Sequence, residues 1–408
     1  MVDPALLQLM KHPTTANDAH MDTEPQKPRT LIFSQRNLSR KLPFRCAHFE
    51  FEDVISQIDS VEMVAPRVDS TSLRHTIAKR IAYHTPLALN PGIQQTPIKA
   101  HYDLFLAICG DPTDLLRVSA LGNWRASCKT AVCLIDELWV TQMAGYHNFL
   151  RMLEKFDVVM LYYSQSAVPL SKQIGRKCIF LPPGVDAIRF CPYPHPPKRV
   201  VDVYSIGRRS EITHRILLRM VEKDGLFYLH DSIAADQVPD PTEHRALFAN
   251  IAKRSRYFIV NPGLIDRPDI RGDQIEIGNR YFEGAASGTI MLGERPNNAE
   301  FERLFDWPDS LIHLPYNSAD IDKIVNALDN EPEKQDRMRR TNVKQALRRH
   351  DWVYRWEAIL KVVGLEPMPG LFQRKELLRN LAEVVMQNET PPMPDSYKSN
   401  STPGAVVC

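Results

Sequence analysis

Short apolar runs recur along most of this 408-residue chain, and segments of helical pattern separate most of them. The first set of runs occupies positions 31–33, 61–65, 102–109, 130–135, 157–162 and 178–181. The second set occupies 200–206, 227–230, 257–260, 289–292 and 311–314. Near-continuous apolar strands that alternate with helices are typical of a parallel sheet covered on both faces. The sequence therefore predicts an α/β protein with two such sheets, one in each half.

A proline-rich segment separates the two halves. Pro183-Gly-Val-Asp186 and Phe190-Cys-Pro192 precede Tyr193-Pro-His-Pro-Pro197, and this density of proline favours a semi-rigid connector, with a plain turn as the alternative. The predicted parts are a disordered lead (1–28), an N-terminal domain (29–186), a linker (187–199), a C-terminal domain (200–364), a C-terminal helix (365–388) and a disordered tail (389–408). Within the second half, helical patterns cover 213–223, 243–253, 299–305, 320–328, 333–360 and 371–386.

Composition narrows the class of protein. The chain has 51 Lys and Arg against 49 Asp and Glu, and this net charge of +2 gives no case for nucleic acid as a partner. Seven cysteines without a Cys-x-x-Cys pair are typical of small core residues in a reducing compartment. No window approaches the roughly 20 apolar residues that span a membrane, and the first residues do not resemble a secretory signal. We expect a cytoplasmic protein without a transmembrane segment, and peripheral association with a membrane stays open.

The stretch 274–294 has the strongest features of a binding site. Gly278 and Asn279 favour a turn that opens a short helix, and Gly288 ends it. Free N–H groups and the positive dipole end of such a helix favour a phosphate. Arg280 adds a fork of donors, and Glu283 is placed to accept hydrogen bonds from hydroxyls such as those of a ribose. A surface ion pair between Arg280 and Glu283 is the alternative.

A resemblance supports the first interpretation. Arg280-Tyr-Phe-Glu-Gly-Ala-Ala-Ser-Gly-Thr-Ile-Met-Leu292 resembles the nucleotide-sugar segment of GT-B glycosyltransferases of the "group 1" set, and looks most like their spore-maturation-type branch. Pro183-Gly-Val-Asp186 and His350-Asp-Trp-Val-Tyr-Arg355 are similar to the interdomain and closing segments of that family. The resemblance implies two doubly wound Rossmann-like domains with a cleft between them, and a C-terminal helix that often crosses back. It further implies that Glu283 binds the ribose of the donor.

Ligands of open parallel sheets bind beyond the carboxyl ends of the strands, so polar residues that follow each strand are the candidates. Gly207 allows close backbone approach, and Arg208 and Arg209 can neutralise a diphosphate leaving group. Arg209 is the catalytic cation in this prediction, and a solubilising turn is the alternative for both arginines. The predicted donor-binding residues are Gly207, Arg208, Arg209, Asn261, Gly278, Asn279, Arg280 and Glu283, with His230 and Asp231 as further strand-end candidates.

The first half is expected to receive the acceptor. Its strand-end candidates are Ser34, Gln35, Arg36, Asp111, Asp136, Glu137 and Ser164. Asp136 ends a buried strand, where burial can raise the pKa of its carboxyl enough to deprotonate an acceptor hydroxyl, so we predict it as the catalytic base. A cap of the following helix is an equal alternative for Asp136. His147 is favoured as a structural histidine over a base.

Absent motifs limit the chemistry. No Gly-x-Gly-x-x-Gly and no P-loop occur, which argues against a dinucleotide dehydrogenase. Asp320-Ile-Asp322 is explained as the cap of a helix, so we predict no metal and no cofactor beyond the donor substrate.

The function implied by the resemblance is a hexosyltransferase of polysaccharide biosynthesis. It would move a sugar from a nucleoside diphosphate sugar to a hydroxyl of a glycan, lipid or protein. Many relatives have a further Glu eight positions before Glu283, where this chain has Ile275 followed by Glu276, and the usual Lys-Gly after the first strand is missing. These departures favour an alternative, a GT-B-shaped scaffold that binds a glycan or nucleotide without turnover. A sugar-phosphate epimerase of the same fold is a third interpretation.

Overall fold

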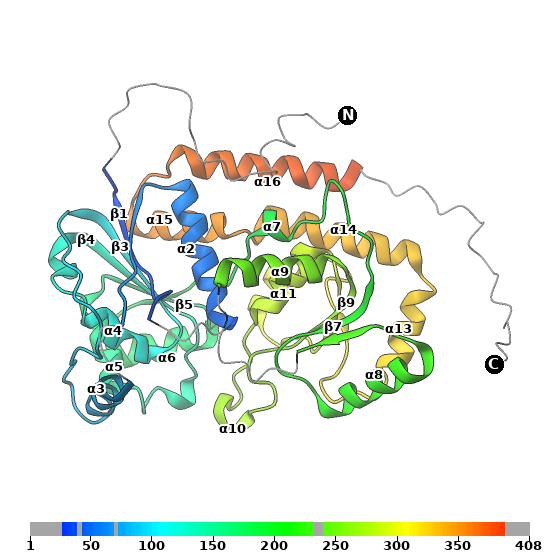
Figure 1. Ribbon diagram of the computed structural model, residues 1–408, viewed down its shortest axis with the longest axis horizontal. Coiled ribbons are helices and arrows are strands. Elements are labelled where there is room, and N and C mark those ends of the chain that lie inside the picture. The colour runs from blue at the N-terminus through cyan, green and yellow to red at the C-terminus, as the bar shows by residue number, and fades with distance from the viewer. Residues whose placement is uncertain (1–26, 39–42, 69–71, 232–237, 239, 388–408) are drawn as a thin grey trace, which may run out of the picture.

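A computed structural model of the chain describes residues 27–38, 43–68, 72–231, 238 and 240–387. Nearly all of the predicted lead, and the whole of the predicted tail, lie outside these residues. Figure 1 shows two lobes side by side, the first in blue and cyan and the second in green and yellow. One long helix, in red, runs along both.

The first lobe is built on six parallel strands in the order β2-β1-β3-β4-β5-β6. Their bounds are β1 (Thr30–Phe33), β2 (Val61–Val64), β3 (Tyr102–Cys109), β4 (Cys128–Ile135), β5 (Val158–Leu161) and β6 (Cys178–Phe180). Nearly every residue of β3 is buried, because helices cover both faces of the sheet. The strand order reverses between β1 and β3.

The second lobe holds five parallel strands in the order β11-β10-β9-β7-β8, which reverses between β7 and β9. Their bounds are β7 (Val201–Ser205), β8 (Tyr228–His230), β9 (Ser255–Val260), β10 (Ile290–Gly293) and β11 (Ile312–His313). Each predicted apolar run thus contains a strand, and the prediction of an α/β fold with two parallel sheets is confirmed.

Helices connect the strands in both lobes. The first lobe contains α2 (Cys46–Ile58), α3 (Ser72–His84), α4 (Leu115–Ser119), α5 (His147–Leu150) and α6 (Ala167–Ile174). After the crossing come α7 (Ala187–Phe190), α8 (Glu211–Asp224), α9 (Pro241–Lys253), α10 (Pro268–Arg271), α11 (Asn279–Ser287), α12 (Ala299–Leu304), α13 (Ile321–Asp329), α14 (Pro332–Arg349), α15 (Trp352–Val363) and α16 (Pro369–Gln387). Short 3-10 turns lie at Pro43–Arg45, Pro112–Asp114, Trp124–Ser127, Val140–Gln142, Arg151–Lys155 and Ser164–Ser166.

Two local predictions are wrong, and one helix was not predicted. The continuous helix over 333–360 is two helices, because Asp351 pairs with the backbone of Val185 and its side chain accepts from the N–H of Val353 to start α15. The pattern did not reveal α2, because its buried residues include the polar His48, Glu50 and Glu52, which hide the apolar period. Asp320 precedes α13 without capping it, and accepts instead from Lys323 Nζ at 2.6 Å.

The two lobes share one apolar core. A single cluster of buried side chains contains Ile32 and Leu106 of the first sheet together with Phe258 and Met291 of the second. Helix α15 packs against α2 and α16, and α16 packs against both α14 and α2 (Figure 1). The C-terminal helices therefore hold the two lobes together by packing against both. The exact bounds of the predicted domains stay a prediction.

Candidate functional site

The amino end of α11 faces a cavity between the lobes. Gly278 precedes the helix in an extended conformation and has no side chain to bond the first-turn N–H groups. Gly288 ends the helix with φ 63°, in the left-handed region that favours glycine. A helix start of this kind presents free N–H donors and the positive end of its dipole to an anion.

The cavity has a volume of about 360 Å³ and both lobes line it. The lining residues of the first lobe are Pro43, Phe44, Ala47, Glu137 and Tyr163. Those of the second lobe are Ile206, Gly207, Arg208, Arg245, Ile259, Asn261, Pro262, Gly263, Leu264, Gly278, Asn279, Arg280 and Glu283. Several of these directly follow β7 and β9, the two strands between which the strand order reverses, and ligands of open α/β sheets bind at such a point. Seven of the eight predicted donor-binding residues therefore meet at one cavity.

Glu283 lies buried behind Arg280. Arg280 Nη1 donates to Glu283 Oε2 at 2.6 Å, and its guanidinium stacks over the Phe248 ring at 4.7 Å. Burial alone raises the pKa of the Glu283 carboxyl, but Arg280 and Arg245 outweigh it and hold the pKa below its ordinary value. A carboxylate has about four acceptor positions, so the ionised Glu283 keeps capacity for a ligand hydroxyl beside its two arginine partners.

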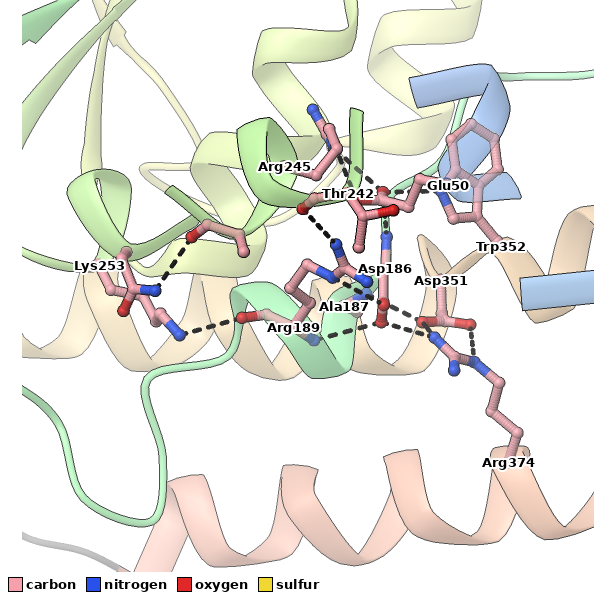
Figure 2. Close-up of polar contacts among 12 residues, drawn as sticks. Glu50, Asp186, Ala187, Arg189, Thr242, Arg245, Lys253, Asp351, Trp352 and Arg374 are labelled. Atoms are coloured by element: carbon pink, nitrogen blue, oxygen red, sulfur yellow. Dashed lines mark hydrogen bonds and ion pairs between the residues drawn. The ribbon is translucent and has the colours of Figure 1, made fainter. Parts of the chain in front are cut away.

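Arg245 of α9 lines the same cavity, and sequence reasoning missed it. It donates to Glu50 of α2 at 2.8 and 3.0 Å and also to Glu283. Glu50 in turn accepts from the N–H of Asp186 at 2.9 Å and from Trp352 Nε1 at 3.0 Å, a network that Figure 2 shows. The cavity wall of the second lobe is thus fixed to the first lobe through buried, charge-assisted hydrogen bonds. No sequence pattern connects these residues.

Arg208 and Arg209 point to different places. Gly207 has φ 89°, and the turn it makes sends the two following side chains apart. Arg208 lines the cavity and pairs with Asp266 at 3.0 Å, whereas Arg209 pairs with Asp231 at 3.0 Å and lines a separate, much smaller cavity. The catalytic role of Arg209 stays a prediction.

Two adjacent carboxylates follow β4. Asp136, the predicted base, has a carboxylate oxygen 2.7 Å from His48 Nε2, and it caps no helix. Its neighbour Glu137 lines the cavity. Burial raises the pKa of the Glu137 carboxyl, Asp136 raises it further, and a 2.7 Å hydrogen bond from Trp139 Nε1 opposes the rise. His147 is exposed on α5, outside this cavity. The role of Asp136 stays a prediction, and Glu137 is the nearer acid.

The loop before α11 binds the first lobe instead of the cavity. Glu276 is buried and accepts from the N–H groups of Ser164 and Gln165, both at 2.9 Å. Gln274 Oε1 accepts from the N–H of Val140 at 2.9 Å. Glu276 therefore closes the two lobes on each other, and it does not replace the Glu that relatives have at the position of Ile275.

Two absences concern the described residues only. They contain no group of three His, Cys, Asp or Glu side chains that could hold a metal ion. None of their helices combines the length and the apolar character needed to cross a bilayer. Six cysteines in this part of the chain, Cys46, Cys109, Cys128, Cys133, Cys178 and Cys191, are buried and form no disulfide, as predicted for core residues.

Two Rossmann-type lobes with parallel sheets and a ligand-sized cavity between them define the GT-B fold, and comparison with known proteins agrees. Residues 237–361, less than a third of the chain, match the family model described as glycosyl transferase-like. A search of curated protein sequences finds no match.

Solved structures resemble the chain at low sequence identity. An α-glucosyltransferase in complex with UDP has a TM-score of 0.50 and 12% identity, over 82% of this chain and 99% of that chain. HepE of Anabaena in complex with UDP-glucose has a TM-score of 0.48 and 12% identity, over 82% and 99%. TarM of S. aureus has a TM-score of 0.41 and 10% identity, and here the match spans 64% of this chain and only 54% of the TarM chain. At these identities the likeness shows the fold alone.

Proposed function

We propose that this protein is a glycosyltransferase that moves a hexosyl group from a nucleoside diphosphate sugar to an acceptor hydroxyl without a metal. The observation that carries the proposal is the interlobe cavity, where the amino end of α11 meets Arg280, Arg208 and Arg245. Cations and oriented N–H groups in a partly enclosed site stabilise a departing diphosphate. The match of the second lobe to the glycosyl transferase-like family supports the same reaction class.

Each residue has a defined part in this proposal. Arg280, Arg208 and the first N–H groups of α11 bind the diphosphate, and Glu283 accepts from the ribose hydroxyls. Arg245 positions Glu283 rather than the reacting atoms. Asp136, paired with His48, takes the proton of the acceptor hydroxyl, and closure of the lobes excludes water from the donor.

The test is donor binding followed by turnover. Calorimetry with UDP, GDP and ADP identifies the nucleotide, and a mass-spectrometric screen of sugar donors identifies the transferred group. Arg280→Ala is expected to lower kcat about 100-fold, because one lost electrostatic contact to the leaving group costs that order of rate. Arg125→Ala, which removes a half-exposed partner of Asp157 far from the cavity, is the matched control. Equal activity of the two variants on every accepted donor would contradict the proposal.

A binding scaffold without turnover is the second candidate. Glu276 is bound to Ser164 and Gln165, and Ile275 stands where relatives have an acid, so the cavity lacks that group. Nucleotide binding that Glu283→Ala abolishes, with no hydrolysis or transfer on any donor, would favour the scaffold. An isomerised donor in the absence of acceptor would indicate an epimerase.

Three finer assignments belong to the same proposal. We place the chain in the spore-maturation-type branch because of the segment from Arg280 to Leu292. We propose a role in polysaccharide biosynthesis, with a glycan, lipid or protein as acceptor and no nucleic acid. A cytoplasmic location is supported by the six buried cysteines that form no disulfide, which are typical of a reducing compartment.

A further inference from the structure

The outer face of α3 exposes large apolar side chains. Leu73 is 66% exposed and Ile77 50%, and in the segment that follows Leu87 is 59% and Leu89 45% exposed. Single exposed apolar residues are common on proteins, but a group of them within one short segment is typical of an interaction surface. We call Leu73 and Ile77, together with the cations described next, the α3 face.

Two basic side chains of α3 lie on the same side as its apolar residues. Leu73, Ile77, Arg80 and His84 follow one another at spacings of four, three and four, so they form one stripe along the helix. The opposite side seats the helix, since Ala78 and Ala82 are buried. Tyr83, at the edge of the exposed stripe, packs edge-on against Phe149 at 4.9 Å. α3 lies at the outer edge of the first lobe (Figure 1), and its stripe of apolar and basic residues is exposed.

The segment that contains α3 carries charged side chains of one sign. No Asp or Glu occurs from position 70 to position 102, while Arg74, Lys79, Arg80 and Lys99 fall in that interval. A surface hollow of about 630 Å³ beside the helix is lined by His75, Lys79, Arg80 and Tyr83, which suits an anionic headgroup. Each Lys or Arg near an anionic membrane surface strengthens attachment, and apolar side chains on the same face add insertion.

We propose that the α3 face binds the surface of an anionic lipid bilayer. The mixture of exposed apolar and basic side chains distinguishes a bilayer from an acidic protein, for which the cations alone would serve. A second copy of the chain fits poorly, because a symmetric contact would bring Arg74 and Arg80 against their own counterparts. The inference does not rest on the proposed function, since attachment to lipid requires no sugar chemistry.

The experiment is flotation of the full chain with lipid vesicles. One set of vesicles is phosphatidylcholine alone, and in the other about a third of the lipid is phosphatidylglycerol. We compare the wild type with Leu73→Ser/Ile77→Ser, with Arg74→Glu/Arg80→Glu, and with Lys361→Glu/Val362→Ser. The last variant changes an exposed cation and an exposed apolar residue on α15 and is the matched control. Circular dichroism melting of each variant shows that it is folded.

The wild type and the control are expected to float with the anionic vesicles only, and more weakly at high salt. Both α3 variants are expected to bind at least about ten-fold more weakly. Wild type that stays unbound, or folded variants that bind as well as the control, would overturn the proposal. Loss of binding in the charge variant with full binding in the apolar variant would indicate an acidic macromolecule, and a wild-type dimer that the apolar variant separates would indicate a second copy.

Discussion

At the scale of single residues, Arg245 is the centre of the site. It is buried between two carboxylates, Glu50 of the first lobe and Glu283 of the second. Burying these three charged side chains costs desolvation energy. Once they are buried, however, removing one of them leaves an uncompensated charge in the interior. The arrangement therefore fixes the position of Glu283 more than it adds to stability.

Arg245→Met is expected to lower the free energy of unfolding by about 3–5 kcal/mol, because the buried Glu50 loses its arginine partner and Glu283 keeps only Arg280. Urea denaturation measures the change. Arg256→Met is the matched control, since Arg256 also joins two carboxylates, Asp202 and Asp329, but all three side chains are about a quarter to a third exposed. The control is expected to lose no more than about 1 kcal/mol. Similar losses in the two variants would mean that burial of the triad is not the cause.

Glu52 makes the free energy of unfolding depend on pH, and the raised pKa of its carboxyl sets the direction of that dependence. Burial raises the pKa of its carboxyl from 4.5 to about 7, against the opposing effects of Arg36 and of a 2.5 Å hydrogen bond from Ser34. The native state therefore holds this proton more tightly than the unfolded chain. The stability from Glu52 is complete below about pH 4.5 and is lost as the pH rises through about 7.

Glu52→Gln, which resembles the protonated carboxyl, is expected to remove this loss, about 3 kcal/mol between pH 4.5 and pH 8. The measurement is the free energy of unfolding of both proteins across that range. Glu154→Gln, at an exposed position, serves as control and is expected to follow the wild type. Parallel curves for the wild type and Glu52→Gln would show that Glu52 is ionised in the native protein throughout.

The sequence predicted some of these residues and not others for a physical reason. Arg280 and Glu283 lie within one helical turn of each other, and Gly278 comes two positions before Arg280, so their proximity follows from local geometry. Arg245 lies 38 positions from Glu283 and 195 from Glu50. Contacts of that separation depend on how the lobes pack, which no periodicity reports. The different directions of Arg208 and Arg209 depend on the backbone angle of Gly207, which is equally invisible in the sequence.

At the scale of elements, the loop before α11 joins the lobes. Glu276 accepts two N–H groups from the turn Ser164–Ser166, which opens α6, and these donors have no other strong acceptor within the turn. A carboxylate at the start of a helix is favoured by the dipole as well. The contact of Glu276 with this turn therefore fixes the position of α11 relative to the first lobe, and with it the width of the cavity.

Glu276→Gln is expected to speed hydrogen exchange at the amides of Ser164 and Gln165 about ten-fold, because an amide offers one acceptor oxygen instead of two. Exchange measured by mass spectrometry at peptide level tests this. Glu302→Gln, which changes an exposed partner of Arg295, is the control and leaves those amides unchanged. Unaltered protection in Glu276→Gln would mean that the lobes hold together without this contact.

Elements themselves were predictable where the pattern was strong. All eleven apolar runs contain strands because burial on both faces leaves no polar position to interrupt them. Helix α2 was missed because polar residues, His48, Glu50 and Glu52, occupy buried positions and hide the amphipathic period. The break between α14 and α15 arises from the contact of Asp351 with Val185, a partner in the other half of the chain.

At the scale of the whole molecule, α16 binds both lobes at once. Arg374 donates to Asp186 at the crossing and to Asp351 at the start of α15, at 2.7 and 2.8 Å, and all three side chains are buried (Figure 2). Resemblance implied that a C-terminal helix often crosses back, but only the structure identifies the ion pairs that hold it.

Arg374→Met is expected to loosen α16 and to lower the unfolding free energy by about 3–5 kcal/mol, since the buried Asp351 loses its arginine partner and Asp186 keeps only Arg189 at 3.4 Å. Limited proteolysis is expected to cleave the variant first in the 364–369 joint. Lys375→Met is the neighbouring control, because its partner Glu357 is over a third exposed. Cleavage of both variants at the wild-type rate would show that apolar packing alone keeps α16 in place.

The hydrogen bond from Arg29 to the carbonyl of Glu366, 337 positions later, has a consequence for synthesis on the ribosome. The apolar side of α2, with Phe51 and Ile58, is covered by α15 and α16, which are translated last. At about 5–20 residues per second, helix α2 waits roughly 20–70 s after its own synthesis for this cover. During that interval its apolar surface is exposed to solvent. A chain released before α16 is made is therefore expected to bind chaperones or aggregate rather than to form a functional truncated protein.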